Sequence, residues 1–299
     1  GGRFPLEVYV AIPDGTALPP GVHWYHPQEH ALVQIGPAPH AAAPVVVVTG
    51  VPWRTGWRYR ERGYRHVYWD AGTMLSQLLA SATSAGIIPY LYSRFPDAAV
   101  TALVGADGVH EWPVATVALG TPSPVEPAGP AAGAAVDIAP HEFPLETAAQ
   151  HAGDLDGWGQ PWPPGAAVEV SSAGPSIDDV ILAGGSQRLV DPQGSLAAEV
   201  LRTSLLAALR GIEVAHVVAV HAVDGVVSGL YRAQDLSAPQ RVGDLREELY
   251  QFCMNQGLGR EAAVGGVAVT DVSQLDDRGY RDAQLASGIV HFVANEAAH

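Results

Sequence analysis

The sequence predicts an α+β protein in which short strands and longer helices follow one another along the chain. Valine-rich runs such as Leu6–Ile12 and Val45–Thr49 have the composition of strands. Apolar residues recur at helical spacing between Val67 and Ala85, and again across Ser195–Arg210. Several motifs of the first part of the chain also recur in the same order in the second part, which indicates a duplicated unit.

Composition and charge argue against several functional classes. The 299 residues are 47% hydrophobic, which is enough to bury a core in one large domain or two fused units. Lys and Arg number 16 against 31 Asp and Glu, and the net charge of −15 argues against binding to nucleic acid or an anionic membrane. Apolar runs such as Val45–Val48 are too short to cross a bilayer. Because Cys253 is the single cysteine and the start does not resemble a signal peptide, we expect a cytoplasmic protein.

The first predicted unit, residues 1–120, begins with strands and continues into a long helix. After Leu6–Ile12, a hairpin is expected at Trp24–Ile35, followed by the strand at Val45–Thr49. The long helix ends at Gly86, a residue that suits a helix C-cap. The last elements expected in this unit are a short helix at Asp97–Leu103 and a strand at Glu111–Gly120.

Residues 121–175 are predicted to be a linker and loop, because the composition shifts there to proline, alanine and glycine. Trp158 and Trp162 lie in this region and are expected to cover an apolar surface. The second unit, residues 176–299, opens with Ser176, a residue typical of a helix start. Its further elements are expected to be a helix at Ser195–Arg210, a strand at Val214–Val223, a helix at Gly243–Gly257, a strand at Val264–Val269 and a helix at Arg281–Ala298.

The duplication is clearest in one four-residue motif. The sequence RGYR at 62–65 returns at 278–281, and a glycine follows seven residues after the last arginine in each copy, Gly72 and Gly288. A valine-rich strand precedes both motifs. The second copy also has a helical segment, Ser176–Leu209, that has no counterpart in the first copy. We therefore expect the matching helices of the first copy in a preceding segment or on another polypeptide.

Four stretches of the sequence resemble motifs of one family. They are GGRFPLEVYV at 1–10, WRTGWRYRERGYRHVYWDAG at 53–72, GADGVHEWPVATVALG at 105–120 and ILAGGSQRLVDP at 181–192. All four resemble motifs of the nitroreductase-like flavoproteins. The arginine-rich stretch at 53–72 is the specific one, and it resembles the SagB-type branch, the azoline dehydrogenases of ribosomal peptide biosynthesis. The resemblance covers residues 1–120 well and 176–299 more loosely.

This resemblance implies a nitroreductase-like fold, with a mixed, mostly antiparallel sheet flanked by helices. It also implies that FMN binds where two copies meet, here in a pseudo-dimer within one chain. FMN would take a hydride from an azoline of a peptide substrate in natural-product biosynthesis. The family supports this step with a lysine–tyrosine pair, and Arg58 and Tyr59 stand in its place. Because a guanidinium keeps its proton, Arg58 would hold an anionic intermediate or orient substrate while Tyr59 passes the proton.

The resemblance also implies the residues that would hold FMN. Glycines at the start of the chain would let the backbone approach the flavin ring, and an arginine and a hydroxyl at a helix start would bind the phosphate. Gln77 is a further candidate, although its amide would equally suit a backbone partner. The candidate FMN residues are Gly1, Gly2, Arg3, Gln77, Ser186 and Arg188.

The second copy departs from the family pattern, so the resemblance implies one working and one decayed flavin site. Gly184 and Gly185 stand where the family has arginines, and Gln274 and Leu275 stand where the first copy has its candidate catalytic pair.

Two alternatives to azoline oxidation remain open. The chain could use FMN to oxidise or reduce another small or carrier-bound metabolite. It could also be a flavin-free scaffold that binds a leader peptide or a cyclodehydratase partner. A metal site is not expected, because the histidine cluster His23, His26 and His30 lies on the predicted hairpin with no cysteine nearby.

Overall fold

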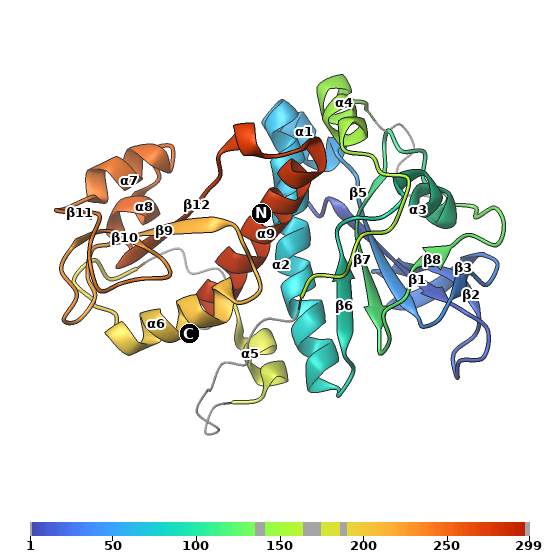
Figure 1. The fold of residues 1–299 in the computed structure, drawn as a ribbon, viewed down its shortest axis with the longest axis horizontal. Coiled ribbons are helices and arrows are strands. Elements are labelled where there is room, and N and C mark those ends of the chain that lie inside the picture. Colours follow the sequence, from blue (N-terminus) through green and yellow to red (C-terminus); the bar gives the residue numbers. More distant parts are fainter. Residues whose placement is uncertain (1, 135–140, 164–174, 186–189, 297–299) are drawn as a thin grey trace. The chain divides into compact units, whose positions relative to one another are not determined.

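The computed structural model describes residues 2–134, 141–163, 175–185 and 190–296 (Figure 1). Contacts divide the chain into two units. The first unit is Gly1–Pro163 with Ser273–Gly288, and the second is Pro164–Val272 with Ile289–His299. Helix α9 (Asp277–Glu296) therefore contributes its first part to the first unit and its last part to the second.

The first unit is built on a six-stranded antiparallel sheet with the strand order β3-β2-β1-β5-β7-β6. The predicted strands and the predicted hairpin are confirmed, whereas β6 was not predicted because its four residues are too few for a clear pattern. A separate two-stranded sheet joins β4 to β8. The bounds are β1 (Leu6–Ile12), β2 (Gly21–His26), β3 (Ala31–Gly36), β4 (His40–Ala41), β5 (Val45–Gly50), β6 (Pro89–Tyr92), β7 (Trp112–Leu119) and β8 (Val125–Glu126).

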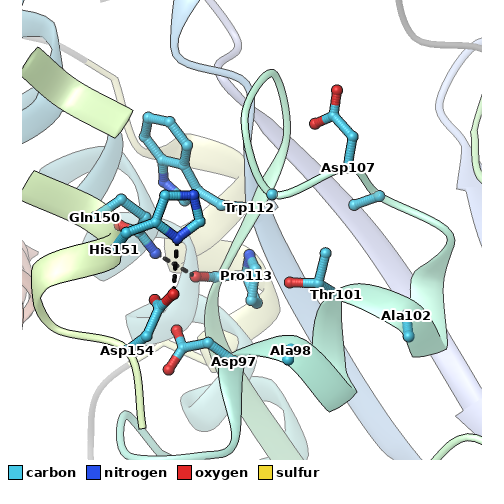
Figure 2. A pocket seen from close by; sticks show the side chains of 12 residues that line it. Asp97, Ala98, Thr101, Ala102, Asp107, Trp112, Pro113, Gln150, His151 and Asp154 are labelled. Atoms are coloured by element: carbon cyan, nitrogen blue, oxygen red, sulfur yellow. Dashed lines mark hydrogen bonds and ion pairs between the residues drawn. The ribbon is translucent and has the colours of Figure 1, made fainter. Parts of the chain in front are cut away.

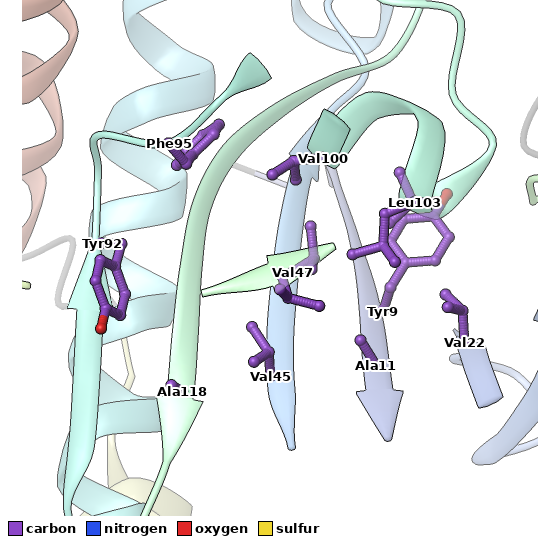
Figure 3. Packing of buried hydrophobic residues seen from close by; sticks show 12 residues of the cluster. Tyr9, Ala11, Val22, Val45, Val47, Tyr92, Phe95, Val100, Leu103 and Ala118 are labelled. Atoms are coloured by element: carbon purple, nitrogen blue, oxygen red, sulfur yellow. The ribbon is translucent and has the colours of Figure 1, made fainter. Parts of the chain in front are cut away.

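Strand β5 is buried along its whole length because helices cover both faces of the sheet. On one face, Val45 and Val47 belong to a core that includes Val100 and Leu103 of α3 (Asp97–Val104), as Figure 3 shows. Successive strand residues point to opposite faces, so Gly50 shares the other face with the remaining valines. A side chain at Gly50 would collide there with Val67 of α2.

The arginine-rich segment folds into three successive helical pieces, α1 (Trp53–Tyr59), η1 (Arg60–Arg62) and α2 (Gly63–Ser84). Arg60 has a left-handed backbone with φ of 50°, which separates α1 from the following turn. The predicted helix end is confirmed, since Gly86 follows α2 with φ of 74°.

The stretch predicted as linker and loop carries structure of its own. Val125 of β8 is fully buried, and helix α4 (Pro144–Ala152) packs within the first unit. Trp158 lies against the same core as Tyr92, and Trp162 donates from Nε1 to the Ser93 hydroxyl at 2.8 Å. The expectation that both tryptophans cover an apolar surface is confirmed for Trp158 by these contacts.

The second unit contains a four-stranded antiparallel sheet in the order β11-β10-β9-β12. Its strands are β9 (Ala215–Val220), β10 (Gly229–Arg232), β11 (Arg241–Val242) and β12 (Val264–Val269). Leu201 and Leu205 of α6 pack on one cluster of this sheet, and Leu249 of α7 packs on another. Its helices are α5 (Ile177–Ala183), α6 (Ala198–Leu209), α7 (Arg246–Phe252) and α8 (Gly257–Glu261). In the turn η2 (Val272–Gln274), Val272 belongs to the second unit and the other two residues belong to the first.

The helix predicted at Gly243–Gly257 is present but shorter than expected. Helix α7 ends at Phe252, because Met254 and Asn255 both have positive φ. The strand order itself repeats between the units. The series β3-β2-β1-β5 in the first sheet corresponds to β11-β10-β9-β12 in the second, and each series is followed by a helix that starts near an RGYR motif. The duplication itself stays a prediction that this repeated order supports.

Candidate functional site

The arginines of the segment at 53–72 have different environments. Arg54 is largely buried, and it donates to the Glu7 carboxylate at 2.7 Å and to the Phe4 carbonyl at 3.0 Å. Glu7 also accepts from Nε1 of Trp24 at 2.6 Å. Arg54 therefore ties α1 to β1, and its role in this network is structural.

Arg58 and Tyr59 lie at the end of α1 within a cluster of basic and aromatic side chains. The Tyr59 ring stacks on the His66 imidazole with centroids 4.2 Å apart and planes 18° apart. His66 in turn meets the edge of Trp69 at 5.0 Å, and the exposed Arg58 guanidinium lies 5.9 Å from the Tyr59 ring. We call Arg58, Tyr59, His66 and Trp69 the Tyr59 cluster. The sequence motif indicates Arg58 and Tyr59 as site residues, and no pattern in the sequence indicates His66 or Trp69.

His66 is neutral in this environment. Burial, with a further contribution from the nearby Arg62 cation, lowers the pKa of His66 to about 4. Its Nε2 atom is buried and has no hydrogen-bond partner among the described residues. The same holds for Nε1 of Trp53 at the start of α1. Buried polar atoms without partners are uncommon, and these two atoms retain unused hydrogen-bonding capacity beside the Tyr59 cluster.

The remaining candidate residues are only partly placed. The Arg3 guanidinium lies over the ring of Trp57 at 4.7 Å, and Trp57 is 55% exposed. Gly2 has φ of 69°, a conformation that favours glycine. Gln77 is half-buried on α2, and its amide has no hydrogen-bond partner in the described part of the chain. The other three candidates, which lie outside the described residues, are Gly1, Ser186 and Arg188.

The second RGYR motif has a different environment from the first. Arg278 and Arg281 are 2% and 3% exposed, and both bind the buried carboxylate of Asp97 at 2.7 Å. Arg281 also donates to Asp154 at 2.9 Å, and Arg278 donates through Nε to the Ser93 carbonyl at 2.8 Å. These arginines hold the first part of α9 within the first unit through these bonds, although Nε of Arg281 is buried without a partner among the described residues.

Helices α2 and α9 meet at equivalent positions of the repeat. The rings of Tyr64 and Tyr280 lie parallel with centroids 6.3 Å apart. A side chain at Gly288 would lie 2.6 Å from the Trp69 carbonyl oxygen and 3.2 Å from the Gly72 Cα atom. The two glycines that follow the motifs therefore allow the helix backbones to approach each other closely.

The residues present fit some of the contacts that FMN requires. A flavin needs cations for its phosphate, and partners both for its ring face and for its polar edge. The described residues offer the exposed guanidinium of Arg58, the exposed ring of Trp57 and the unpartnered Nε2 atom of His66. The residues predicted to bind the phosphate lie outside the described ranges. The described residues therefore match only the contacts that the flavin ring requires.

Comparison with known proteins identifies the fold. No protein-family model matches the sequence. Over 135 residues the chain is 27% identical to a protein of Methanocaldococcus jannaschii whose name assigns it to the nitroreductases, a match that spans 40% of this chain and 67% of that protein. A crystal structure from Anabaena variabilis, also named as a nitroreductase, superposes with a TM-score of 0.79 at 24% identity, covering 99% of this chain and 73% of the other.

A weaker similarity involves a chain of the E. coli microcin synthetase McbBCD complex with truncated pro-MccB17 bound. Its TM-score is 0.35 at 20% identity, over 40% of this chain and 53% of that chain, which does not establish a shared fold. The Anabaena match does establish a shared fold, so the chain has a nitroreductase-like α+β fold. The fold predicted from the sequence is confirmed.

Proposed function

We propose that this chain is an FMN-dependent oxidoreductase that oxidises an azoline or a related peptide-derived heterocycle. The observation that carries the proposal is the nitroreductase-like fold, which matches over 99% of the chain. The Tyr59 cluster adds support, because it combines an exposed cation with stacked aromatic rings where the SagB-type resemblance puts the catalytic pair.

The chain's own residues would bind, orient and move a proton. When bound, FMN supplies the acceptor for a hydride. Arg58 keeps its proton, so its cation would stabilise negative charge that develops on the heterocycle. Tyr59, whose ring is fixed against His66, would take the proton that leaves the substrate if the neighbouring Arg58 cation holds it as the phenolate. Gly2 and Arg3 would frame the flavin ring from the segment that precedes β1.

The remaining parts of the site are also proposals. Gly1 would extend the frame around the ring, Ser186 and Arg188 would bind the phosphate, and Gln77 would donate to the cofactor. We further propose a peptide substrate, a preceding segment or second chain that completes the first copy, and a cyclodehydratase partner. A cytoplasmic location would suit this pathway. In the described part of the chain, every helix is too short or too polar to span a membrane.

The first experiment is an absorbance spectrum of the purified protein, followed by heat release and chromatography of any bound ligand. A flavin spectrum with FMN in the released fraction is expected. A colourless protein that takes up no added FMN, alone or with the partner that completes the first copy, would contradict the proposal. That result would favour the flavin-free scaffold.

The second experiment tests the residues rather than the cofactor. We expect Tyr59→Phe to retain FMN and to lose turnover of an azoline peptide by about 100-fold, the usual contribution of a general acid or base. Tyr25→Phe is the matched control, because Tyr25 is a partly exposed tyrosine that contacts His30 on the β2–β3 hairpin. Equal turnover of both variants would remove Tyr59 from the proton transfer. A flavoprotein that turns over other metabolites but no azoline would favour a different substrate.

A further inference from the structure

A pocket in the first unit is lined by none of the residues of the Tyr59 cluster. Its volume is about 320 Å³, at the lower end of the range for small-molecule sites. Helix α3 forms one wall, and the end of α4 with the residues after it forms the opposite wall (Figure 2). Ala98, Ala102, Ala106 and the Trp112 ring supply apolar lining. The pocket is therefore suited to a ligand with a short apolar portion.

A histidine held in one orientation lines the pocket. The Nδ1 atom of His151 lies 2.7 Å from a carboxylate oxygen of Asp154. The other oxygen of Asp154 accepts from the buried Arg281 at 2.9 Å, so the carboxylate is itself fixed. Because a carboxylate only accepts hydrogen bonds, Nδ1 carries a ring proton, and a ring with that single proton has Nε2 as its acceptor.

Three polar groups of the lining residues lack a partner among the described residues. They are Nε2 of His151, the hydroxyl of Thr101, which Figure 2 shows on the opposite wall, and the buried Nε1 of Trp112. A Cβ atom at Gly108 would lie 3.7 Å from the side chains of His151 and Thr101, so these three residues border the same space. The other polar groups are satisfied, since Gln150 bonds Tyr68 and the Pro113 carbonyl.

The charges around the pocket favour a cation. Asp97, Asp107 and Asp154 line it, while only Arg278 and Arg281 lie against the aspartates as buried cations. His110 is the histidine partner of Asp107, at 2.6 Å. Among the aspartates and arginines, three carboxylates outnumber two guanidiniums. An ammonium group would match this balance and donate to His151 as well.

We propose that this pocket binds a small alkylammonium ligand, whose N–H group donates to Nε2 of His151 and to the Thr101 hydroxyl and whose chain lies on Trp112 and Ala98. The site is independent of the proposed flavin site, since it shares no residue with it. Such a site would recognise a free amine or a lysine-like side chain by the same chemistry.

The test is an NMR titration of the intact chain with three probes of equal length, n-butylammonium, n-butanol and butyrate, above the ordinary titration range of histidine. We expect saturable shifts of amides at Thr101, Gly108 and Asp154 with butylammonium in the millimolar range, and weaker binding of the other two probes. We expect His151→Ala to weaken binding by about fivefold to tenfold, and Thr101→Val by about twofold to fivefold.

His40→Ala is the matched control, because His40 is an exposed histidine on β4 that does not line the pocket. It should leave binding unchanged. The proposal is overturned if butyrate or butanol binds as tightly as the ammonium, if the shifts map elsewhere or are absent, or if His151→Ala binds like the control. A lysine peptide run in parallel separates a free amine from a side chain as the source.

Discussion

The two RGYR motifs contain the same four residues, and the structure gives them opposite environments. In the first copy, Arg62 and Arg65 are exposed, and Arg65 donates to the Tyr280 hydroxyl at 2.8 Å. In the second copy, Arg278 and Arg281 are buried against Asp97. The difference comes from partners that the motif does not contain. Asp97 on α3 and Asp154 after α4 both come from the part of the chain that precedes the second motif by more than a hundred residues.

This comparison separates a surface that can meet a ligand from a cluster that stabilises the fold. Buried ion pairs are expensive to break because a charge is left without its partner, whereas exposed arginines contribute little to stability. Around the first motif, Arg58 and the Tyr59 ring remain accessible to a ligand. From the repeated sequence alone, both motifs would be given the same role. Their environments differ, and they favour ligand contact around the first motif and fold stabilisation at the second.

The largest expected effect comes from replacing equivalent arginines of the two motifs. Arg281→Ala removes bonds to both Asp97 and Asp154, so the free energy of unfolding should fall by about 3 kcal/mol or more. Arg65→Ala removes one exposed hydrogen bond and should cost less than about 1 kcal/mol. Denaturant unfolding of both variants measures the difference. Equal losses would show that the two motifs are energetically alike.

A smaller effect is expected where α2 and α9 cross. Gly288→Ala puts a methyl group against the Trp69 backbone, which cannot move aside as a flexible side chain can. We expect a loss of about 1–3 kcal/mol despite the better helix propensity of alanine. Gly157→Ala is the control, since nothing lies within 4 Å of its Cβ position, and it should change stability by less than about 0.5 kcal/mol. If Gly288→Ala left the free energy of unfolding unchanged, helices α2 and α9 would not approach each other so closely.

The glycines within the two motifs also differ in their acidic neighbours. A Cβ atom at Gly63 would lie 3.0 Å from Glu146, which is 1% exposed and has no hydrogen-bond partner among the described residues. Burial raises the pKa of Glu146 from 4.5 to about 8. Beside Gly279, the hydrogen bond from Arg94 instead lowers the pKa of the exposed Asp276.

This contrast gives an effect on stability that depends on pH. Between pH 4.5 and about 8, folded Glu146 keeps a proton that the unfolded chain has lost, so the free energy of unfolding falls as pH rises through this window. Glu146→Gln should remove that dependence and stabilise the protein by about 1–3 kcal/mol above the window, because burying the amide offsets part of the gain. Thermal unfolding against pH measures it, with the exposed Glu126→Gln as control. If the stability of the wild-type protein rose with pH over this window, the claim that folded Glu146 stays protonated would be wrong.

The sequence predicted those elements whose pattern is local. Leu6–Ile12 was predicted with its observed bounds, because β-branched and aromatic residues specify a strand over a few positions. The helix α4 was not predicted, since its run PLETAAQHA contains few large apolar residues and follows a proline-rich stretch. Fold class was predictable from motif resemblance, and the superposition confirms it.

The site was only half predictable for a different reason. Arg58 and Tyr59 were found from a motif, but the stacking partner His66 was not, although it lies only seven residues further on. Asp97 and Arg278 are 181 residues apart, and no local pattern indicates that they pair. The one available signal was that the second RGYR copy lacks the arginine-rich surroundings of the first.

We propose that the first copy holds the cofactor while the arginines of the second RGYR motif are engaged in the fold. The most direct test is an equilibrium titration with FMN, followed by flavin fluorescence, of the wild-type chain, Arg3→Ala and Arg232→Ala, an exposed arginine of β10 in the second sheet. We predict one FMN per chain, with affinity lowered about tenfold or more in Arg3→Ala and unchanged in Arg232→Ala. Two equivalent FMN sites per chain, or binding that is insensitive to Arg3, would contradict this proposal.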